Sequence, residues 1–246
     1  DGSPGFHIDG GIRIRGGYSV GTWNPKHSLR LFFRAVYGSA KLHFPLFGDD
    51  GADEFDCIDL RTPQNYSWAG NGDGRNTFLR DVFSRDAFLA MGQPAGRSRH
   101  YHVYINGHYW GLWQTEERTE ASFGETYLCG NKEDYDVVKS KGVNGGYDIE
   151  VTDGNITNWQ ALYNETMAGL SDNSKFRRLQ GLNPDGSRSE VFTNLLDADN
   201  LADYMVLTYY TGNFDGPGSR FVAINNFSCI LSRVKPEGFR TFPHDF

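Results

Sequence analysis

The sequence predicts an α+β fold with a sheet-rich N-terminal lobe and a more helical C-terminal lobe. Segments that alternate between apolar and polar residues, including one clear hairpin, gather in the first half of the chain. From about Trp159 onward, apolar residues recur mainly with helical spacing. Two lobes fit this division better than one layer, so we expect one domain over residues 1–246, with lobes at 1 to about 140 and 141–246.

The N-terminal elements begin with a pair of strands. Residues 11–34 contain two alternating stretches, GIRIRG and SLRLFFR, which are separated by the Gly- and Ser-rich turn GGYSVGTWNP. A further short strand is predicted at Cys57–Arg61. Over Asn76–Met91 the period changes to 3.6, which predicts a helix that covers this early sheet. Its apolar face consists of Leu79, Phe83, Ala87 and Ala90.

The clearest local signal is the dipeptide Asn106-Gly107. It lies between the alternating segments His100–Ile105 and His108–Trp113. Asn-Gly accommodates the positive φ angles of a type I′ turn, so we predict a β-hairpin. The hairpin is rich in Tyr and Trp, which can stack on sugar rings. Such alternation is more often one buried and one exposed face of a sheet.

The C-terminal elements are predicted as strands and helices in alternation. Strands are expected at Asp136–Lys139 and Tyr147–Val151, and helices at Trp159–Leu170 and Leu201–Tyr210. Two more strands, Arg220–Asn225 and Phe239–Phe242, are expected near the end. Regions 142–155 and 183–190 are rich in Gly, Asn, Asp and Ser, so we predict loops there.

The second of these helices carries two further expectations. Asp199 or Asn200 can cap its N-terminus. Its later turns are apolar on every side, which predicts that they are buried.

Charge and hydropathy exclude several classes of protein. The chain has 246 residues, with 24 Lys and Arg against 31 Asp and Glu, a net charge of −7 and a pI of about 5.5. This is the wrong sign for a non-specific nucleic-acid binder or for a binder of anionic membranes. The longest apolar run, Met205–Tyr210, is far too short to insert into a membrane. Because the sequence starts at Asp1 and stops at Phe246, we expect a piece of a longer gene product, with the domain truncated at its C-terminal end.

The cysteines do not define a site. Cys57, Cys129 and Cys229 are an odd number and form no CxxC pair, so they indicate neither a zinc site nor a disulfide framework. One disulfide remains open.

The Gly-rich loop after the first strand and the segment that carries Lys26 are candidates for phosphate binding. The Gly-rich loop Arg15–Ser19 is followed by Lys26, and backbone N–H groups together with cations can cradle phosphates. The alternative interpretation is an ordinary Gly-rich hairpin. Glu117 closes the second strand of the Asn-Gly hairpin, where the alternative is a solvated strand end.

Two aspartates of the C-terminal half are candidates for catalysis or metal binding. Asp215 follows a helix in the turn Gly212–Gly216, and Asp245 lies at the end of a predicted strand. Two carboxylates in such positions suit a hard divalent cation that keeps several waters. The alternatives are a helix C-cap with Gly212 in the left-handed conformation and an exposed loop aspartate.

Taken in order along the chain, these features resemble the CotH kinase family, which comprises atypical kinases related to spore coat protein H. The matching segments are IRIRGGYS, NPKHSLRLFF, LFG, GRNTFLRDVF, YHVYINGHYWGLWQTEER, DADNLADYMVL, TGNFDG and FPHDF. They cover essentially the whole chain in the order of the family. The resemblance implies a two-lobed atypical protein-kinase-like fold.

The resemblance also implies a function. Family members transfer the γ-phosphate of ATP, with Mg²⁺, to Ser or Thr of an exported or surface protein, so an extracellular or cell-surface location is expected. No nucleic-acid partner and no membrane insertion are expected, and the oligomeric state is left open. Two alternatives remain, a non-catalytic cell-surface binding or adhesion module and a carbohydrate-associated module that uses the aromatic hairpin.

In the N-terminal lobe, the resemblance assigns the phosphate contacts to Arg15 and Lys26. Gly16 and Ser19 belong to the same phosphate-binding loop. Glu117 would position the lysine or the metal from the end of the hairpin.

In the C-terminal lobe, the resemblance makes Asp215 the catalytic base, or the group that orients the accepting hydroxyl. Asp245 would bind Mg²⁺, with Asp215 as a second ligand. The chain departs from the family pattern at His27 and His244, which replace a lysine and a tryptophan. Arg220 stands about where spore-coat members carry an asparagine that can bind a second metal, and its cation would repel Mg²⁺ or bind phosphate. The retained residues favour a competent kinase.

Overall fold

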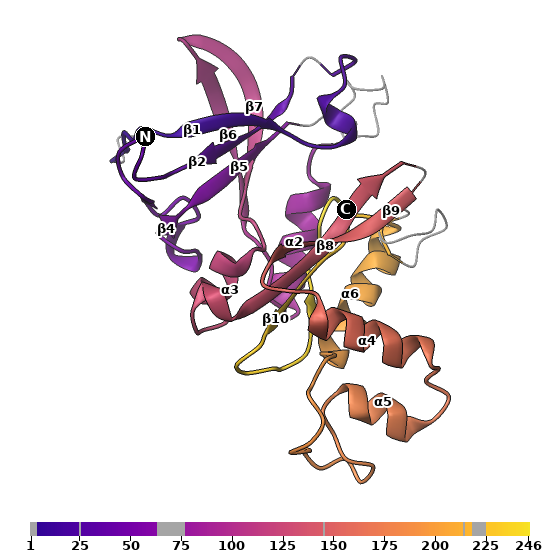
Figure 1. Ribbon diagram of the computed structural model, residues 1–246. Helices are drawn as coiled ribbons and strands as arrows, with labels where there is room; N and C mark the ends of the chain where they lie inside the picture. Colours follow the sequence, from indigo (N-terminus) through magenta and orange to yellow (C-terminus); the bar gives the residue numbers. More distant parts are fainter. Residues whose placement is uncertain (1–3, 25, 63–76, 145, 214, 218–224) are drawn as a thin grey trace. The chain divides into compact units, whose positions relative to one another are not determined.

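The structure is a computed structural model (Figure 1). It describes residues 4–24, 26–62, 77–144, 146–213, 215–217 and 225–246. The chain divides into two compact units. Unit 1 comprises Asp1–Arg85 and Gly96–Arg118, and unit 2 comprises Asp86–Ala95 and Thr119–Phe246. The expected lobe boundary near residue 140 falls within a strand of unit 2. Each unit contains its own sheet, so the mixture of sheet and helix predicted from the sequence is confirmed.

Unit 1 is built on a five-stranded antiparallel sheet with the order β1-β2-β5-β7-β6. Its strands are β1 (Gly11–Arg15), β2 (Ser28–Phe32), β5 (Cys57–Arg61), β6 (Ser98–Ile105) and β7 (His108–Glu116). The predicted strands are therefore confirmed, because their alternation and their turns are local signals. The short pair β3 (Leu42–His43) and β4 (Glu54–Phe55) was not predicted. An apolar cluster gathers around this pair and consists of Phe33, Leu42, Leu46, Phe47, Phe55 and Ile58.

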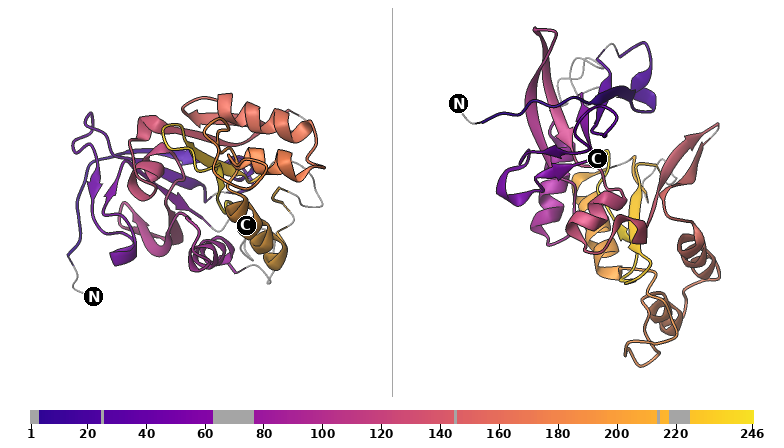
Figure 2. Two further views of the ribbon diagram at one scale, coloured as in Figure 1. Left: turned by 90° about the horizontal axis from the view of Figure 1, so that it is seen from below. Right: turned by 60° about the vertical axis from the view of Figure 1, so that its left-hand side comes forward.

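The β6–β7 hairpin has the predicted turn and one irregularity. Asn106 and Gly107 have φ angles of 51° and 79°, as a type I′ turn requires. Val103 pairs with Gly111 but Tyr104 pairs with Tyr109, so Trp110 is the extra residue of a β-bulge. The distal end of the hairpin projects away from the rest of the unit 1 sheet (Figures 1 and 2).

The helix predicted after β5 is α2 (Arg80–Ala90), and its predicted apolar face is wrong. Leu79 and Phe83 are 55% and 51% exposed. The buried residues of α2 are instead Asp81, Ser84, Arg85 and Phe88. Asp81 forms an ion pair with Arg61 of β5, and Arg85 forms one with Glu116 of β7. Buried ion pairs therefore hold this face, and apolar periodicity cannot reveal them. Asn76, where the prediction began, lies outside the described residues.

Unit 2 contains a four-stranded antiparallel sheet with the order β11-β10-β8-β9. Its strands are β8 (Tyr135–Val143), β9 (Gly146–Asp153), β10 (Ser228–Ser232) and β11 (Arg240–Thr241). Three predicted strands are confirmed, but β8 and β9 extend through most of the segment 142–155 that was predicted as a loop. The predicted strand Arg220–Asn225 lies almost wholly outside the described residues, and β10 follows it.

Two helices cover opposite faces of this sheet (Figure 1). Phe123 of α3 (Ala121–Tyr127) packs in a cluster with Ile230 of β10. Trp159 of α4 (Thr157–Met167) packs against the cluster that contains Cys229 and Leu231. Because Ile230 alternates with its neighbours along β10, the two clusters lie on the two faces of the strand. Helix α3 was not predicted, and α4 confirms the helix expected near Trp159.

Helix α6 (Ala198–Thr211) confirms the last predicted helix and corrects two of its details; α5 (Asn173–Leu179) was not predicted. The N-cap of α6 is Asp197, whose carboxylate accepts the N–H of Asn200, and not Asp199 or Asn200. Its later turns are not wholly buried, since Tyr209 and Tyr210 are 69% and 79% exposed. One stripe, with Tyr204 and Leu207, packs against Phe88 and Phe246. Gly212 ends the helix in the left-handed conformation with φ 64°, as the C-cap interpretation expects.

Within the described residues, each helix is too short or too polar to cross a bilayer. The thiols of Cys129 and Cys229 are free, so neither forms a disulfide. Burial raises the pKa of the Cys229 thiol to about 12.

Candidate functional site

Unit 1 contains a network of buried ion pairs across its sheet. Arg30 donates to both oxygens of Asp59, with Nε–Oδ1 2.6 Å and Nη2–Oδ2 3.0 Å. Arg15 joins the same carboxylate, with Nε 3.1 Å from Oδ2, and its Nη1 lies 3.3 Å from Oε2 of Glu116. Burial by itself would raise the pKa of Asp59, but Arg15, Arg30 and Arg118 outweigh it and hold that pKa below its ordinary value. The guanidinium of Arg15 is thus bound by two buried carboxylates.

The loop after β1 places the predicted phosphate-binding residues close together. Gly16 follows Arg15 with a φ of 125°, a conformation that favours glycine. A side-chain carbon at Gly16 would overlap the hydroxyl of Ser19, which is itself buried. Asn24 donates to the carbonyl of Ser19 at 2.8 Å and fixes the loop. The structure therefore brings Arg15, Gly16 and Ser19 into one tight turn.

Lys26 lies against strand β7. Its Nζ donates to the carbonyl of Leu112 at 3.0 Å and lies 5.3 Å from the ring centroid of Trp113. Burial lowers the pKa of the ammonium. Neither partner carries a negative charge, so the ammonium keeps its charge available for an anionic ligand.

Glu117 follows the end of β7 and contacts Arg97. Its Oε2 accepts the backbone N–H of Arg97 at 2.7 Å and lies 3.7 Å from Nη1 of the same residue. The described side-chain contacts of Lys26 are with β7, and the expected role of Glu117 in positioning the lysine or the metal stays a prediction. The neighbouring Glu116 binds Arg15 and Arg85, and sequence reasoning missed it because both partners are distant in the chain.

In unit 2, one asparagine connects the two predicted aspartates. Nδ2 of Asn226 donates to Oδ2 of Asp215 at 3.1 Å and to the backbone carbonyl of Asp245 at 3.3 Å. The N–H of Asp215 in turn donates to Oδ1 of Asn213 at 3.1 Å, which shapes the turn after α6. Asn226 is buried, whereas the Asp215 side chain is exposed. The structure thus brings Asp215 and Asp245 to a single side chain.

Sequence reasoning missed Asn226. The expected position for an asparagine near the aspartates was about residue 220, and Arg220 lies outside the described residues. A local signal does exist, since the pair Asn225-Asn226 lies one residue before strand β10. Asn226 has a φ of 49°, and asparagine adopts this left-handed conformation more readily than most residues.

The donor set fits a hard divalent cation. Carboxylate and amide oxygens are the ligands that Mg²⁺ takes from proteins, usually few in number because the ion keeps several waters. Among the described residues, the hydrogen bonds of the Asn226 side chain use Nδ2, which leaves Oδ1 as a ligand for a cation. No group of three or more His, Cys, Asp and Glu side chains gathers in the described part of the chain. A metal here would rest on Asp215, Asp245, the amide and water.

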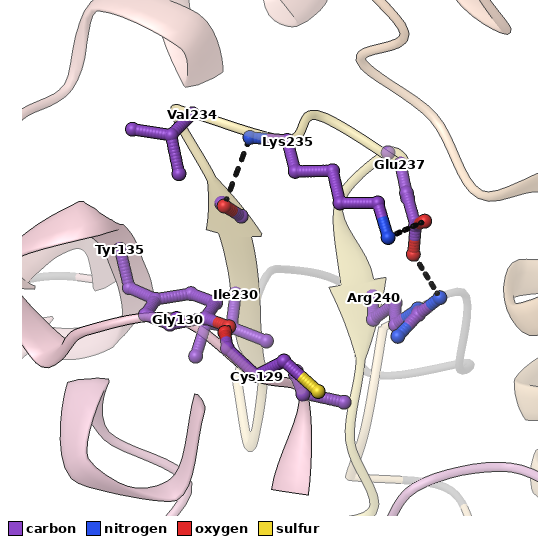
Figure 3. A pocket seen from close by; sticks show the side chains of 11 residues that line it. Cys129, Gly130, Tyr135, Ile230, Val234, Lys235, Glu237 and Arg240 are labelled. Carbon is purple, nitrogen blue, oxygen red and sulfur yellow. Dashed lines mark hydrogen bonds and ion pairs between the residues drawn. The ribbon is translucent and has the colours of Figure 1, made fainter. Parts of the chain in front are cut away.

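A separate pocket of about 160 Å³ lies in unit 2 and contains none of the predicted site residues (Figure 3). Its charged side chains are engaged in ion pairs: Glu237 lies 3.5 Å from Nζ of Lys235 and 3.1 Å from Nη2 of Arg240, and Arg240 also pairs with Asp197. The thiol-bearing Cys129 and the ring of Tyr135 form the opposite wall. Nothing in its charge or lining connects it to phosphate chemistry.

Comparison with known proteins gives one family. The family model described as CotH kinase protein matches residues 12–246, nearly the whole chain. No curated protein matches the sequence. The match confirms the resemblance noted from the motifs, and the chain belongs to the CotH kinase family.

Proposed function

We propose that the chain, as a member of the CotH kinase family, is an ATP- and Mg²⁺-dependent kinase that phosphorylates Ser or Thr of an exported or cell-surface protein. The observation that carries the proposal is the Asn226 side chain, which binds Asp215 and the backbone of Asp245 together. Phosphoryl transfer requires mainly a positioned cation and a positioned acceptor, and two aspartates whose turns meet at one asparagine can supply both positions.

We further propose a two-lobed, kinase-like division of labour. Unit 1 would act as the N-terminal lobe and supply Lys26 for the phosphates. Unit 2 would act as the C-terminal lobe and supply Asp215 and Asp245. Among the cations of unit 1, Lys26 is the stronger candidate because it faces a carbonyl and a ring, whereas Arg15 faces two carboxylates. The roles of Arg15, Gly16, Ser19, Glu117 and Arg220 stay predictions.

Asp245 and Asp215 would hold Mg²⁺, with Oδ1 of Asn226 as a further ligand. The ion would supply charge neutralisation at the phosphate oxygens. Lys26 would neutralise the same group of oxygens with its ammonium.

Asp215 would act on the accepting hydroxyl. The hydroxyl oxygen forms a bond to the γ-phosphorus, and the bond between the γ-phosphorus and the β–γ bridging oxygen breaks, so that ADP leaves with that electron pair. The hydroxyl proton passes to the carboxylate of Asp215. The exposure of Asp215 leaves room for an acceptor side chain.

The test is a calorimetric titration of ATP, with and without Mg²⁺, into the wild-type chain and two variants. We expect Mg²⁺-dependent binding by the wild type and its loss in Asp245→Ala. Asp215→Asn should keep binding, because an amide oxygen can still bind the ion. In a parallel assay of phosphate transfer from ATP, Asp215→Asn should be about 10²- to 10⁴-fold slower, the usual contribution of a general base. Normal transfer by both variants would show that the site is wrong. Absence of binding by the wild type would favour the non-catalytic surface module.

One observation favours a second candidate, the carbohydrate-associated module. Tyr104 and Tyr109 near the hairpin turn are both exposed, and their ring centroids are 5.2 Å apart. Exposed rings of this kind can stack on sugars. Binding of soluble glycans without metal, abolished by the double substitution of Tyr104 and Tyr109 with Ala, would support it.

A further inference from the structure

The bulge in strand β7 lies directly beside Lys26. Gly111 follows the extra residue Trp110 and has a φ of 97°, which favours glycine. A side-chain carbon at this position would lie 2.7 Å from Nζ of Lys26 and 3.7 Å from its Cε. Glycine is therefore favoured here by the backbone conformation, and any side chain at this position would displace the ammonium from its place.

The next two residues complete what we call the ammonium seat, formed by Gly111, Leu112 and Trp113. The carbonyl of Leu112 accepts from Nζ at 3.0 Å, and the ring of Trp113 lies 5.3 Å away. Trp113 is fully buried, and its Nε1 donates to the carbonyl of Trp110 at 3.3 Å, which ties the ring across the bulge. The seat is thus built from rigid parts of a strand.

Lys26 is also held from its backbone side. The hydroxyl of Thr62 donates to the carbonyl of Lys26 at 2.8 Å, and Thr62 is fully buried. Both ends of the lysine are therefore fixed, the backbone by the end of β5 and the ammonium by the bulge of β7.

We propose that Gly111 is a positioning residue of the nucleotide site, which sets the place from which Lys26 reaches the phosphates. This inference rests on the proposed function. The ammonium has three N–H donors, and the seat uses one of them on a neutral carbonyl. The remaining donors and the full charge stay available to an anion, whereas a carboxylate partner would compete with phosphate.

The seat suits an ammonium better than a guanidinium. It offers one carbonyl acceptor and a nearby ring to a compact point charge, whereas the guanidinium of arginine is larger and presents a planar fork of donors. We therefore expect the shape of the Lys26 head group to matter as well as its charge.

The test compares Gly111→Ala with Gly107→Ala as a matched control. Both glycines lie in the hairpin with positive φ, at 97° and 79°, but a side-chain carbon at Gly107 meets nothing within 4 Å. The variant Lys26→Arg, which lies in a loop and keeps the charge, serves if Gly111→Ala does not fold. NMR of the lysine side chains without nucleotide shows whether the Lys26 ammonium lies in the seat, and the signals of Lys26 are assigned by their absence in Lys26→Arg. Calorimetry in the presence of Mg²⁺ measures the affinity for ATP and for AMP.

In Gly111→Ala we expect the Lys26 resonances to lose the ring-current shift of Trp113. ATP should bind about tenfold more weakly, the size of one charge-assisted hydrogen bond, while AMP binding is unchanged. Lys26→Arg should lose as much ATP affinity as Lys26→Ala. The double variant Lys26→Ala/Gly111→Ala should bind ATP as well as Lys26→Ala alone. Gly107→Ala should match the wild type in both measurements.

Wild-type ATP affinity in Gly111→Ala or in Lys26→Arg would overturn this inference alone. Equal loss of ATP and AMP would overturn it too, because the effect would not concern the outer phosphates. If the wild-type chain binds no ATP, the proposed function fails and this inference fails with it, whatever the lysine resonances show.

Discussion

Asn226 combines a strained backbone with a side chain that links two carboxylate-bearing turns. Its φ of 49° costs most residues free energy, and its amide binds Asp215 and the carbonyl of Asp245. We predict that Asn226→Gly, which accepts this φ, keeps the stability of the wild type within about 1 kcal/mol but binds Mg·ATP about tenfold more weakly. Asn226→Ala should lose both stability and binding. Urea denaturation measures the stability, and calorimetric titration with ATP and Mg²⁺ measures the binding. If Asn226→Gly bound ATP with the Mg²⁺ dependence of the wild type, Asn226 would not be part of the metal site.

Asp59 should make the free energy of unfolding sensitive to acid. Its pKa in the folded chain lies below the ordinary value of about 3.9, because Arg15, Arg30 and Arg118 outweigh burial. The folded state therefore favours the ionised carboxylate, and this stabilisation is present above about pH 4 and is lost as the pH falls through the folded pKa.

We predict that Asp59→Asn costs about 3–5 kcal/mol at pH 7, as breaking a buried ion pair does, and that its remaining stability depends less on acid. The control is Glu54→Gln, which removes an exposed ion pair with Lys41 and should cost less than about 1 kcal/mol. Urea denaturation between pH 3 and pH 7 measures both. If the free energy of unfolding of Asp59→Asn fell with pH as steeply as that of the wild type, the acid sensitivity would come from other carboxylates.

At the scale of elements, α2 shows that apolar periodicity can predict a helix without predicting which of its faces is buried. The apolar residues at helical spacing predicted the helix correctly and its buried face incorrectly, since Asp81 and Arg85 are buried by their ion pairs with β5 and β7. We predict that Asp81→Ala costs about 3–5 kcal/mol because it removes a buried carboxylate that pairs with the buried Arg61. Phe83→Ala, on the face that the apolar pattern chose, should cost about 1 kcal/mol or less. Chemical denaturation of both variants checks the order, and a larger cost for Phe83→Ala would reverse it.

At the scale of the whole molecule, the candidate residues are divided between two units. Lys26 belongs to unit 1, and Asp215, Asn226 and Asp245 belong to unit 2. A nucleotide that uses both groups should slow hydrogen exchange in β7 and in the segment before β10 when Mg²⁺ is present. With Asp245→Ala, the Mg²⁺-dependent protection of both segments should disappear. Protection confined to one unit in the wild type would contradict the two-lobed proposal.

The sequence by itself determined the features that neighbouring residues encode. Asn106-Gly107 specified the hairpin, because a type I′ turn depends on the φ preferences of two adjacent residues. The alternation in Cys57–Arg61 specified β5, and the order of short motifs identified the family that the match over residues 12–246 confirms. The strand β10 and helix α3 carry weaker local patterns, so their formation depends on the sheet and clusters they join.

Only the tertiary structure decided which partner each charged or polar side chain finds. Lys26 and Leu112 are 86 positions apart, and Arg15 and Glu116 are 101 positions apart, so no local pattern relates them. The burial of Asp81 and Arg85 and the space above Gly111 likewise depend on the strands that the sheet brings together. Asn226 lies only 11 and 19 positions from Asp215 and Asp245, but its link to both also forms only when the chain has folded. Backbone conformation is set largely by adjacent residues, whereas burial and pairing of charge depend on contacts that exist only after the chain has folded.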